Sequence, residues 1–247
     1  RPVILKITST GSDGITRALR GVNVGSALLA SLHRRVDACV ATTGDAAQEA
    51  RTFGIPSDRI NVLPNGIDTT TYSPWSAERR RQARRTAGIA DETVALFCGR
   101  LSPEKNIDGL VQAWRSVIRA MPKARLVVVG EGPLREAIAN LVRQEGLEGS
   151  VILAGGQADV LPWYQMADLF VLPSHHEGLS NSLLEAMSCG LPVVSTRVSG
   201  SSEILSEADV GELVDTGDEA ALARSITSML TDARRRERCG INARLYV

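Results

Sequence analysis

Short apolar runs recur along the chain, and each has the length of a β-strand rather than of a membrane-spanning helix. Segments with helical periodicity lie between most of these runs. This alternation is typical of a parallel sheet with helices on both faces, so the sequence predicts an α/β fold. The predicted strands are Val3–Ile7, Ala38–Ala41, Ile60–Leu63, Val94–Cys98, Leu126–Val129, Val151–Leu153, Leu169–Leu172, Val193–Ser195 and Glu212–Val214.

The pattern is interrupted at Leu63–Asp68, where Pro64 and an Asn-Gly pair predict a hinge between two domains. Residues 1–64 hold too few strands for a complete sheet, so we interpret them as the last part of a preceding domain. Residues 65–230 are sufficient for a domain of ordinary size. Residues 231–247 predict the start of a C-terminal helix, and we expect both ends of the chain to be truncated.

The composition limits the classes of partner. Lys plus Arg and Asp plus Glu both total 28, which argues against nucleic acid as the main partner. The 4 cysteines form no CxxC pair, which argues against a disulfide framework or a zinc site and favours a reduced, cytoplasmic protein. Five arginines between Arg79 and Arg85 predict a solvated helix face that starts near Ser76, and contact with an anionic membrane surface is the alternative.

The segment Gly99–Asn106 follows a predicted strand and carries two cations. Ser102 is a candidate N-cap and Pro103 a candidate first helical residue, so the sequence predicts a helix from here to about Ala120. Arg100 then precedes the helix, and Lys105 lies in its first turn. Two cations at a helix N-terminus can bind a diphosphate without a metal, whereas solvated loop side chains are the alternative for either residue alone.

Two carboxylates lie on either side of another predicted helix start. Glu177 follows the strand Leu169–Leu172, and Glu185 lies eight positions later, inside the next helix. Between them, free backbone N–H groups attract phosphate oxygens, while the carboxylates can accept hydrogen bonds from hydroxyls. This arrangement suggests a sugar-nucleotide site. The adjacent His175 and His176 point to opposite sides of an extended segment and have no third ligand at a suitable spacing, so we expect no metal.

A second glycine-containing loop, Gly130–Pro133, also joins a strand to a helix. It lacks the third glycine of a dinucleotide-binding fingerprint, which argues against an NAD-dependent oxidoreductase. We interpret this loop as a structural turn at the rim of the site.

Several of these segments together resemble the retaining glycosyltransferases of family four, the group-one glycosyltransferases. The resemblance extends from Asp37 onward and implies a GT-B architecture, with two Rossmann-like domains, and no metal or other cofactor. The segments that carry it are Pro64–Asp68, Arg100 with Lys105, Ala167–Ser174, Glu177 with Glu185, and Glu185–Val194.

By this resemblance, the protein would transfer a sugar from a nucleotide-diphosphate donor of the UDP or GDP type to the hydroxyl of a glycan, lipid or polyol acceptor, with retention of configuration. Arg100 and Lys105 would contact the diphosphate, Glu177 the donor sugar, and Glu185 the ribose. The other implied donor-binding residues are Gly99, Gly156, Gln157, Val160, Gly178, Leu179 and Ser180.

One position departs from the family pattern. The family often has a histidine after the strand that Val3–Ile7 resembles, and here that position is Thr8 or Ser9, with Asp13 as a candidate replacement. This departure, and the expected loss of most of the acceptor domain, leave two consequences open. The chain would bind donor better than it catalyses transfer, or it would be a nucleotide-sugar-binding module without catalysis.

Overall fold

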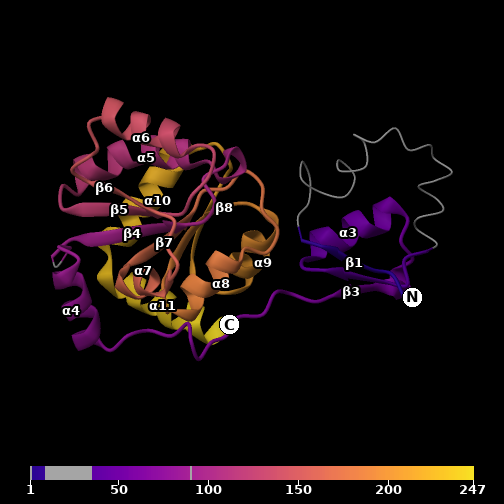
Figure 1. The fold of residues 1–247 in the computed structure, drawn as a ribbon. Helices are drawn as coiled ribbons and strands as arrows, with labels where there is room; N and C mark the ends of the chain where they lie inside the picture. The colour runs from indigo at the N-terminus through magenta and orange to yellow at the C-terminus, as the bar shows by residue number, and fades with distance from the viewer. Residues whose placement is uncertain (1, 9–34, 90) are drawn as a thin grey trace. The chain divides into compact units, whose positions relative to one another are not determined.

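The computed structural model describes residues 2–8, 35–89 and 91–247 (Figure 1). By their internal contacts, the residues form two compact units. The first contains Arg1–Gly66, His176–Ser180 and Val198–Ile204, and the second contains Ile67–His175, Asn181–Arg197 and Leu205–Val247. Among the described residues, no helix is both long and apolar enough to cross a membrane.

The first unit contains a parallel sheet of three described strands in the order β1-β2-β3. Helix α3 packs on this sheet through a row of small residues, Ala46, Ala47 and Ala50, which are almost fully buried. The side chain of Thr43 caps the start of α3 by accepting a hydrogen bond from the backbone of Ala46. The elements are β1 (Ile4–Ile7), β2 (Ala38–Ala41), α3 (Gly44–Phe53), the 3₁₀ helix η2 (Ser57–Arg59) and β3 (Ile60–Val62).

The second unit contains a six-stranded sheet in the order β6-β5-β4-β7-β8-β9, and every pair in it is parallel. The central strands are mainly apolar because helices cover both of their faces. The α/β prediction is therefore confirmed. The strands are β4 (Thr93–Cys98), β5 (Ala124–Val129), β6 (Val151–Gly155), β7 (Leu169–Leu172), β8 (Val193–Thr196) and β9 (Gly211–Val214).

Helices α5, α6 and α10 lie on one side of this sheet, and α7, α8 and α11 lie on the other (Figure 1). The main core lies under the first group, where Trp114 of α5 is completely buried and its indole N–H donates to the Ser150 hydroxyl at 3.2 Å. The helices after Ile67 are α4 (Ala77–Thr86), α5 (Ile107–Ala120), α6 (Arg135–Gln144), α7 (Leu161–Met166), α8 (Asn181–Ser188), α9 (Ser199–Glu207), α10 (Glu219–Thr231) and α11 (Ala233–Tyr246). Most of α9 belongs to the first unit by its contacts.

The helix predicted from Pro103 to Ala120 begins later than expected. A 3₁₀ helix, η3 (Pro103–Lys105), comes first, and α5 starts only at Ile107. Asn106 separates them in the left-handed conformation, with φ of 51°, which asparagine tolerates better than most residues. Its side-chain amide also donates to the carbonyl oxygen of Pro173 at 3.2 Å, and this contact fixes the break. Lys105 therefore ends the 3₁₀ turn and is not part of α5.

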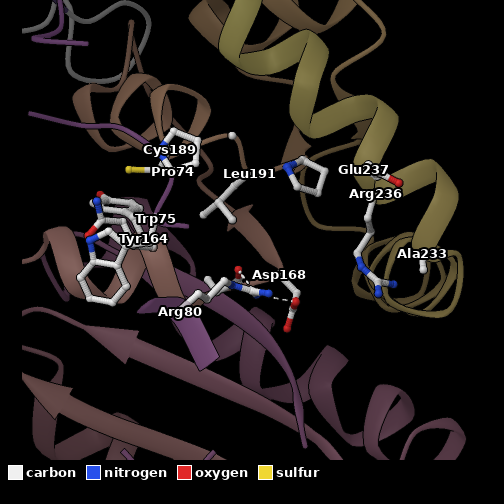
Figure 2. A pocket seen from close by; sticks show the side chains of 14 residues that line it. Pro74, Trp75, Arg80, Tyr164, Asp168, Cys189, Leu191, Ala233, Arg236 and Glu237 are labelled. Atoms are coloured by element: carbon white, nitrogen blue, oxygen red, sulfur yellow. Dashed lines mark hydrogen bonds and ion pairs between the residues drawn. The ribbon is translucent and has the colours of Figure 1, made fainter. Parts of the chain in front are cut away.

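Helix α4 begins after Ser76 as predicted, but its arginines do not form only a solvated face. Arg84 is buried and donates to Asp168 at 3.0 Å, and Arg80 donates to the other oxygen of the same carboxylate at 2.6 Å (Figure 2). Asp168 immediately precedes β7 and also accepts from the backbone N–H of Val94 at 2.8 Å. The prediction of a solvated helix face was wrong for Arg80 and Arg84, because they connect α4 to the residue that precedes β7.

Candidate functional site

The order of strands in the six-stranded sheet reverses between β4 and β7. The chain builds β4, β5 and β6 in one direction and then returns to add β7, β8 and β9 on the other side of β4. In open parallel sheets, ligands bind beyond the carboxyl ends of the strands at such a switch point. The loops that follow β4 and β7 start from neighbouring strands at this point, and they carry Arg100, Lys105 and Glu177.

The loop after β4 presents its two cations on either side of one carboxylate. Arg100 is exposed, and Lys105 is half-buried at the end of η3. Between them, Glu104 accepts a hydrogen bond from the Ser102 hydroxyl, and this bond is the main cause that lowers the pKa of the Glu104 carboxyl. The positive charges of Lys105 and Arg100 lower that pKa further. The loop is therefore positive overall, with one ionised acid inside it.

Two hydrogen bonds fix the start of the β7 loop against the β4 loop. The backbone N–H of His175 donates to the carbonyl oxygen of Glu104 at 2.8 Å, and the Asn106 side chain donates to Pro173 as described above. Beyond His175 the loop continues through Glu177, which is half-buried, to α8. Three predicted donor-binding residues, Gly178, Leu179 and Ser180, are buried in this last part of the loop.

The loop Gly130–Pro133 lies directly against the β4 loop. The backbone N–H of Leu101 donates to the carbonyl oxygen of Glu131 at 2.9 Å. A Cβ atom on Gly132 would lie 2.3 Å from the carbonyl oxygen of Leu101, and one on Gly130 would lie 1.8 Å from that of Gly99. Only glycine permits such close approach of two backbones. These contacts agree with the interpretation of the loop as a structural turn.

The predicted base-binding loop follows β6. Gly156 and Gln157 are exposed, and Val160 is half-buried at the start of α7. The carboxylate of Glu131 accepts from the backbone N–H of Gly156 at 3.0 Å and pairs with Arg135. This loop lies at the same edge of the sheet as the β4 loop, but β5 separates their two strands.

Glu185 lies in the second turn of α8, where its carboxylate is half-buried. The hydroxyl of Tyr164 donates to its Oε2 at 2.8 Å. Burial raises the pKa of Glu185, and hydrogen bonding from Tyr164 and Tyr72 opposes part of that effect. No local pattern in the sequence indicates the tyrosine contact, because it joins two helices across 21 positions and a buried tyrosine resembles any other core aromatic.

The remaining sequence predictions concern metals and the N-terminal strand. Within residues 2–8, 35–89 and 91–247, no cluster of three or more His, Cys, Asp or Glu side chains could hold a metal ion. Thr8 is exposed directly after β1. Ser9 and Asp13 lie outside the described residues.

A cavity of about 310 Å³ lies at the opposite, amino-terminal edge of the six-stranded sheet (Figure 2). It was not predicted, and its lining contains none of the predicted site residues. Its arginines already have structural partners. Arg80 binds Asp168, and Arg236 donates to the carbonyl oxygen of Met229 at 3.0 Å, near the end of α10.

Comparison with known families agrees with this geometry. Residues 79–246, which are more than half of the chain, match the family described as glycosyl transferases group 1, and residues 16–71 match glycosyltransferase family 4. The chain belongs to the group 1 glycosyltransferases. This membership confirms the family resemblance.

Curated relatives of this glycosyltransferase chain include two bacterial enzymes. A GDP-mannose-dependent alpha-(1-6)-phosphatidylinositol monomannoside mannosyltransferase of Mycolicibacterium smegmatis is 33% identical over 79% of this chain and 53% of its own length. A D-inositol 3-phosphate glycosyltransferase of Xylanimonas cellulosilytica is 34% identical over 84% of this chain and 52% of its own length. The chain therefore spans about half the length of these relatives.

Solved structures support the GT-B fold of this family. Anabaena HepE in complex with UDP and glucose superimposes with a TM-score of 0.87 at 22% identity. The superposition covers 100% of this chain and 66% of HepE. The C-terminal domain of LpcC, a group 1 glycosyl transferase of Francisella tularensis, has a TM-score of 0.64 at 27% identity, and covers 72% of this chain and 95% of that domain. The predicted GT-B type of α/β fold is thereby confirmed.

Proposed function

We propose that this chain supplies the donor-binding part of a retaining, metal-independent glycosyltransferase that moves a sugar from a nucleotide-diphosphate sugar to an acceptor hydroxyl. Family membership supports the reaction class. The observation that carries the proposal is the positive loop with Arg100 and Lys105 at the topological switch point of the six-stranded sheet. An anionic diphosphate is the ligand that this position and this charge favour.

In this proposal, Arg100 and Lys105 bind the diphosphate. As the glycosidic bond breaks, negative charge grows on the leaving phosphate, and two fixed cations stabilise that charge more than they stabilise the ground state. Glu104 lies between them and reduces the local positive charge. The departing phosphate accepts the proton of the attacking hydroxyl on the same face of the sugar, which retains the anomeric configuration without a covalent intermediate.

The other predicted residues would recognise the uncharged parts of the donor. Glu177 accepts hydrogen bonds from hydroxyls of the transferred sugar, with the backbone of Gly178–Ser180 beside it. Glu185 accepts from the ribose. The loop Gly156–Val160 binds the base through its backbone. The raised pKa of Glu185 gives its role a lower pH limit, because protonation removes acceptor capacity from the carboxyl.

The donor and acceptor are proposed only by class. The relatives include a protein named for GDP-mannose, and HepE has been solved with UDP-glucose, so UDP and GDP are the nucleotides to test. We propose a glycan, lipid or polyol acceptor and a cytoplasmic protein with peripheral contact to a membrane.

The test is calorimetric titration of the chain with UDP and, separately, with GDP, each with and without EDTA. We expect one nucleotide to bind equally well in both buffers. Arg100→Ala, Lys105→Ala and Glu185→Ala should each weaken that binding by up to about 3 kcal/mol, because each removes a charge-assisted contact. Arg119→Ala, at an exposed position at the end of α5, is the matched control and should leave the affinity unchanged.

A second measurement separates binding from catalysis. Release of UDP from UDP-glucose, or of GDP from GDP-mannose, should occur slowly with water as acceptor and stop in Lys105→Ala. Nucleotide binding without any release would favour the non-catalytic module. Loss of binding on addition of EDTA would refute metal independence, and a folded chain that binds neither nucleotide would refute the proposal.

A further inference from the structure

We propose that Tyr164 is a positioning residue that holds the Glu185 carboxylate in the orientation in which it accepts hydrogen bonds from the donor's ribose. This inference rests on the proposed function, because it needs Glu185 to face a nucleotide. It assigns a role to a side chain that belongs to none of the predicted motifs.

The tyrosine itself is held rigidly. Tyr164 lies on α7 and is completely buried. Figure 2 shows it among the side chains around the cavity. Its ring meets that of Tyr72 edge-on at 6.2 Å and that of Phe170, in β7, at 6.0 Å. Because two aromatic neighbours pack against it, its hydroxyl has a fixed position. That hydroxyl donates to Glu185 Oε2 at 2.8 Å.

The contact connects Glu185 to the carboxyl end of β4, although Tyr164 also lines the cavity at the amino-terminal edge of the sheet. The Tyr164 hydroxyl also interacts with the thiol of Cys98, the last residue of β4. Gly99 and Arg100 follow immediately. Through Tyr164, the carboxylate on α8 is therefore tied to the strand end that carries the proposed diphosphate loop.

The hydrogen bonds leave the carboxylate able to bind a ligand. An ionised carboxylate offers about four acceptor sites. The two tyrosine hydroxyls, of Tyr164 and Tyr72, occupy only part of this capacity. A half-buried glutamate without them would be free to rotate and would be protonated more readily, since its burial already favours the neutral form. The tyrosine thus fixes the direction of the acceptor and favours its ionised form.

The other groups around Glu185 do not replace this role. The titratable or charged groups packed near it are Tyr72 before α4, Cys98 in β4, Tyr164 in α7, Cys189 after α8, and Arg244 of α11 beyond Cys189. Burial raises the pKa of Cys189 to about 12, so that thiol stays neutral. Tyr72 also donates to Glu185, but Tyr164 is the completely buried donor, at 2.8 Å.

The test compares ribose recognition in Tyr164→Phe, which keeps the ring and removes only the hydroxyl. UDP and GDP are titrated beside their 2′,3′-dideoxy analogues, which lack the hydroxyls that Glu185 would bind. We expect the variant to lose about three- to tenfold in affinity for the ribonucleotide and less than about twofold for the dideoxy analogue. Tyr246→Phe is the matched control, because Tyr246 also donates to a glutamate, Glu207, at 3.2 Å, but on the surface.

The pH dependence supplies a second readout. Affinity for the ribonucleotide should fall as the pH drops through the pKa of Glu185. The hydrogen bond from Tyr164 lowers the pKa of Glu185, so its removal in Tyr164→Phe should raise that pKa. The variant should therefore lose affinity for the ribonucleotide at a higher pH. A structural role alone would not move this profile.

Each outcome decides the inference. An equal loss for ribonucleotide and dideoxy analogue would mean general damage to the pocket and would overturn it, as would an unchanged variant. If the unmodified chain binds the ribonucleotide and its dideoxy analogue with equal affinity, the ribose role of Glu185 is refuted, while donor binding is not. Failure of the unmodified chain to bind any nucleotide would refute the proposed function itself.

Discussion

Asp168→Asn tests whether the ion pairs between α4 and the six-stranded sheet stabilise the second unit. Burial alone would raise the pKa of Asp168, but the charges of Arg80 and Arg84 and the hydrogen bonds from Arg80 and Val94 outweigh it and lower that pKa. The carboxylate is therefore better stabilised in the folded protein than in water. The asparagine keeps the shape of the side chain, removes its charge and replaces one acceptor oxygen with an NH₂ donor.

The expected magnitude follows from burial. The Arg84 side chain is 7% exposed and that of Asp168 is 16% exposed, so the variant leaves a buried guanidinium without its counter-charge. Removal of one partner of a buried pair typically costs about 3–5 kcal/mol. Arg80 is 33% exposed and contributes less because water screens it. We expect a loss near the lower limit, about 3 kcal/mol, which corresponds to a fall of about 6–12 °C in Tm for a unit of this size.

Tryptophan fluorescence during thermal unfolding is the appropriate assay. All 3 tryptophans, Trp75, Trp114 and Trp163, belong to the second unit, so the signal reports the unfolding of that unit. The effect should depend on pH in a defined direction. Because the folded pKa of Asp168 is lowered, its stabilisation is complete above the unfolded pKa of about 3.9 and is lost as the pH falls through the folded value. The difference in stability between the unmodified chain and Asp168→Asn should therefore become smaller at low pH.

Asp215→Asn is the matched control. Asp215 pairs with Arg197 at 3.1 Å, but these side chains are 80% and 55% exposed, so the same substitution should cost at most about 1 kcal/mol. The reasoning fails if Asp168→Asn lowers Tm no more than the control does. It also fails if the difference in stability does not narrow at low pH.

Two further predictions concern the loop that carries Arg100. Gly132→Ala should lower the free energy of unfolding by about 1–3 kcal/mol and weaken nucleotide binding, because its Cβ would displace the backbone at Leu101. Gly149→Ala, with no atom within 4 Å of the added Cβ, should change neither stability nor binding, and equal shifts in Tm for the two variants would contradict the prediction. Glu104→Gln should strengthen binding of inorganic pyrophosphate up to about fivefold in calorimetry, because it removes a negative charge beside Arg100, and weaker binding would contradict the assignment of the loop.

Strand positions were largely predictable because the buried part of a parallel strand must be apolar. Ala38–Ala41 and Leu169–Leu172 were predicted with the observed bounds. Strands β1 and β3 are one residue shorter than predicted, and the remaining strands extend beyond their apolar runs. Strand β5 begins at Ala124 and includes Arg125, which pairs with Glu92 at 3.3 Å, since backbone pairing with β4 continues there whatever the side chain. Hydropathy alone gives no signal for such an extension.

The errors share a physical cause, which is contact between distant segments. Local capping signals favoured a helix start at Pro103, and they did not include the bond from Asn106 to Pro173, 67 positions away. The hydrogen bond from Tyr164 to Glu185 likewise joins separate helices, and no local signal predicted it. The positions of the loops at strand ends were easier to predict, because the parallel topology brings those ends to one edge of the sheet. The binding roles of the residues on these loops stay predictions. The specific side-chain contacts between the loops had no counterpart in the sequence pattern.

The ion pairs of Arg80 and Arg84 with Asp168 reduce the charge that α4 can offer to a membrane. Counted from the sequence, five arginines and Glu78 give α4 a net charge of +4, but Arg80 and Arg84 are committed to Asp168, so the exposed charge is three minus one, or +2. A basic residue near an anionic membrane contributes about 1 kcal/mol. The expected attraction therefore falls from about 4 to about 2 kcal/mol, which is too weak for stable binding by α4 alone. If the full protein binds a membrane, residues outside α4 must supply most of the affinity.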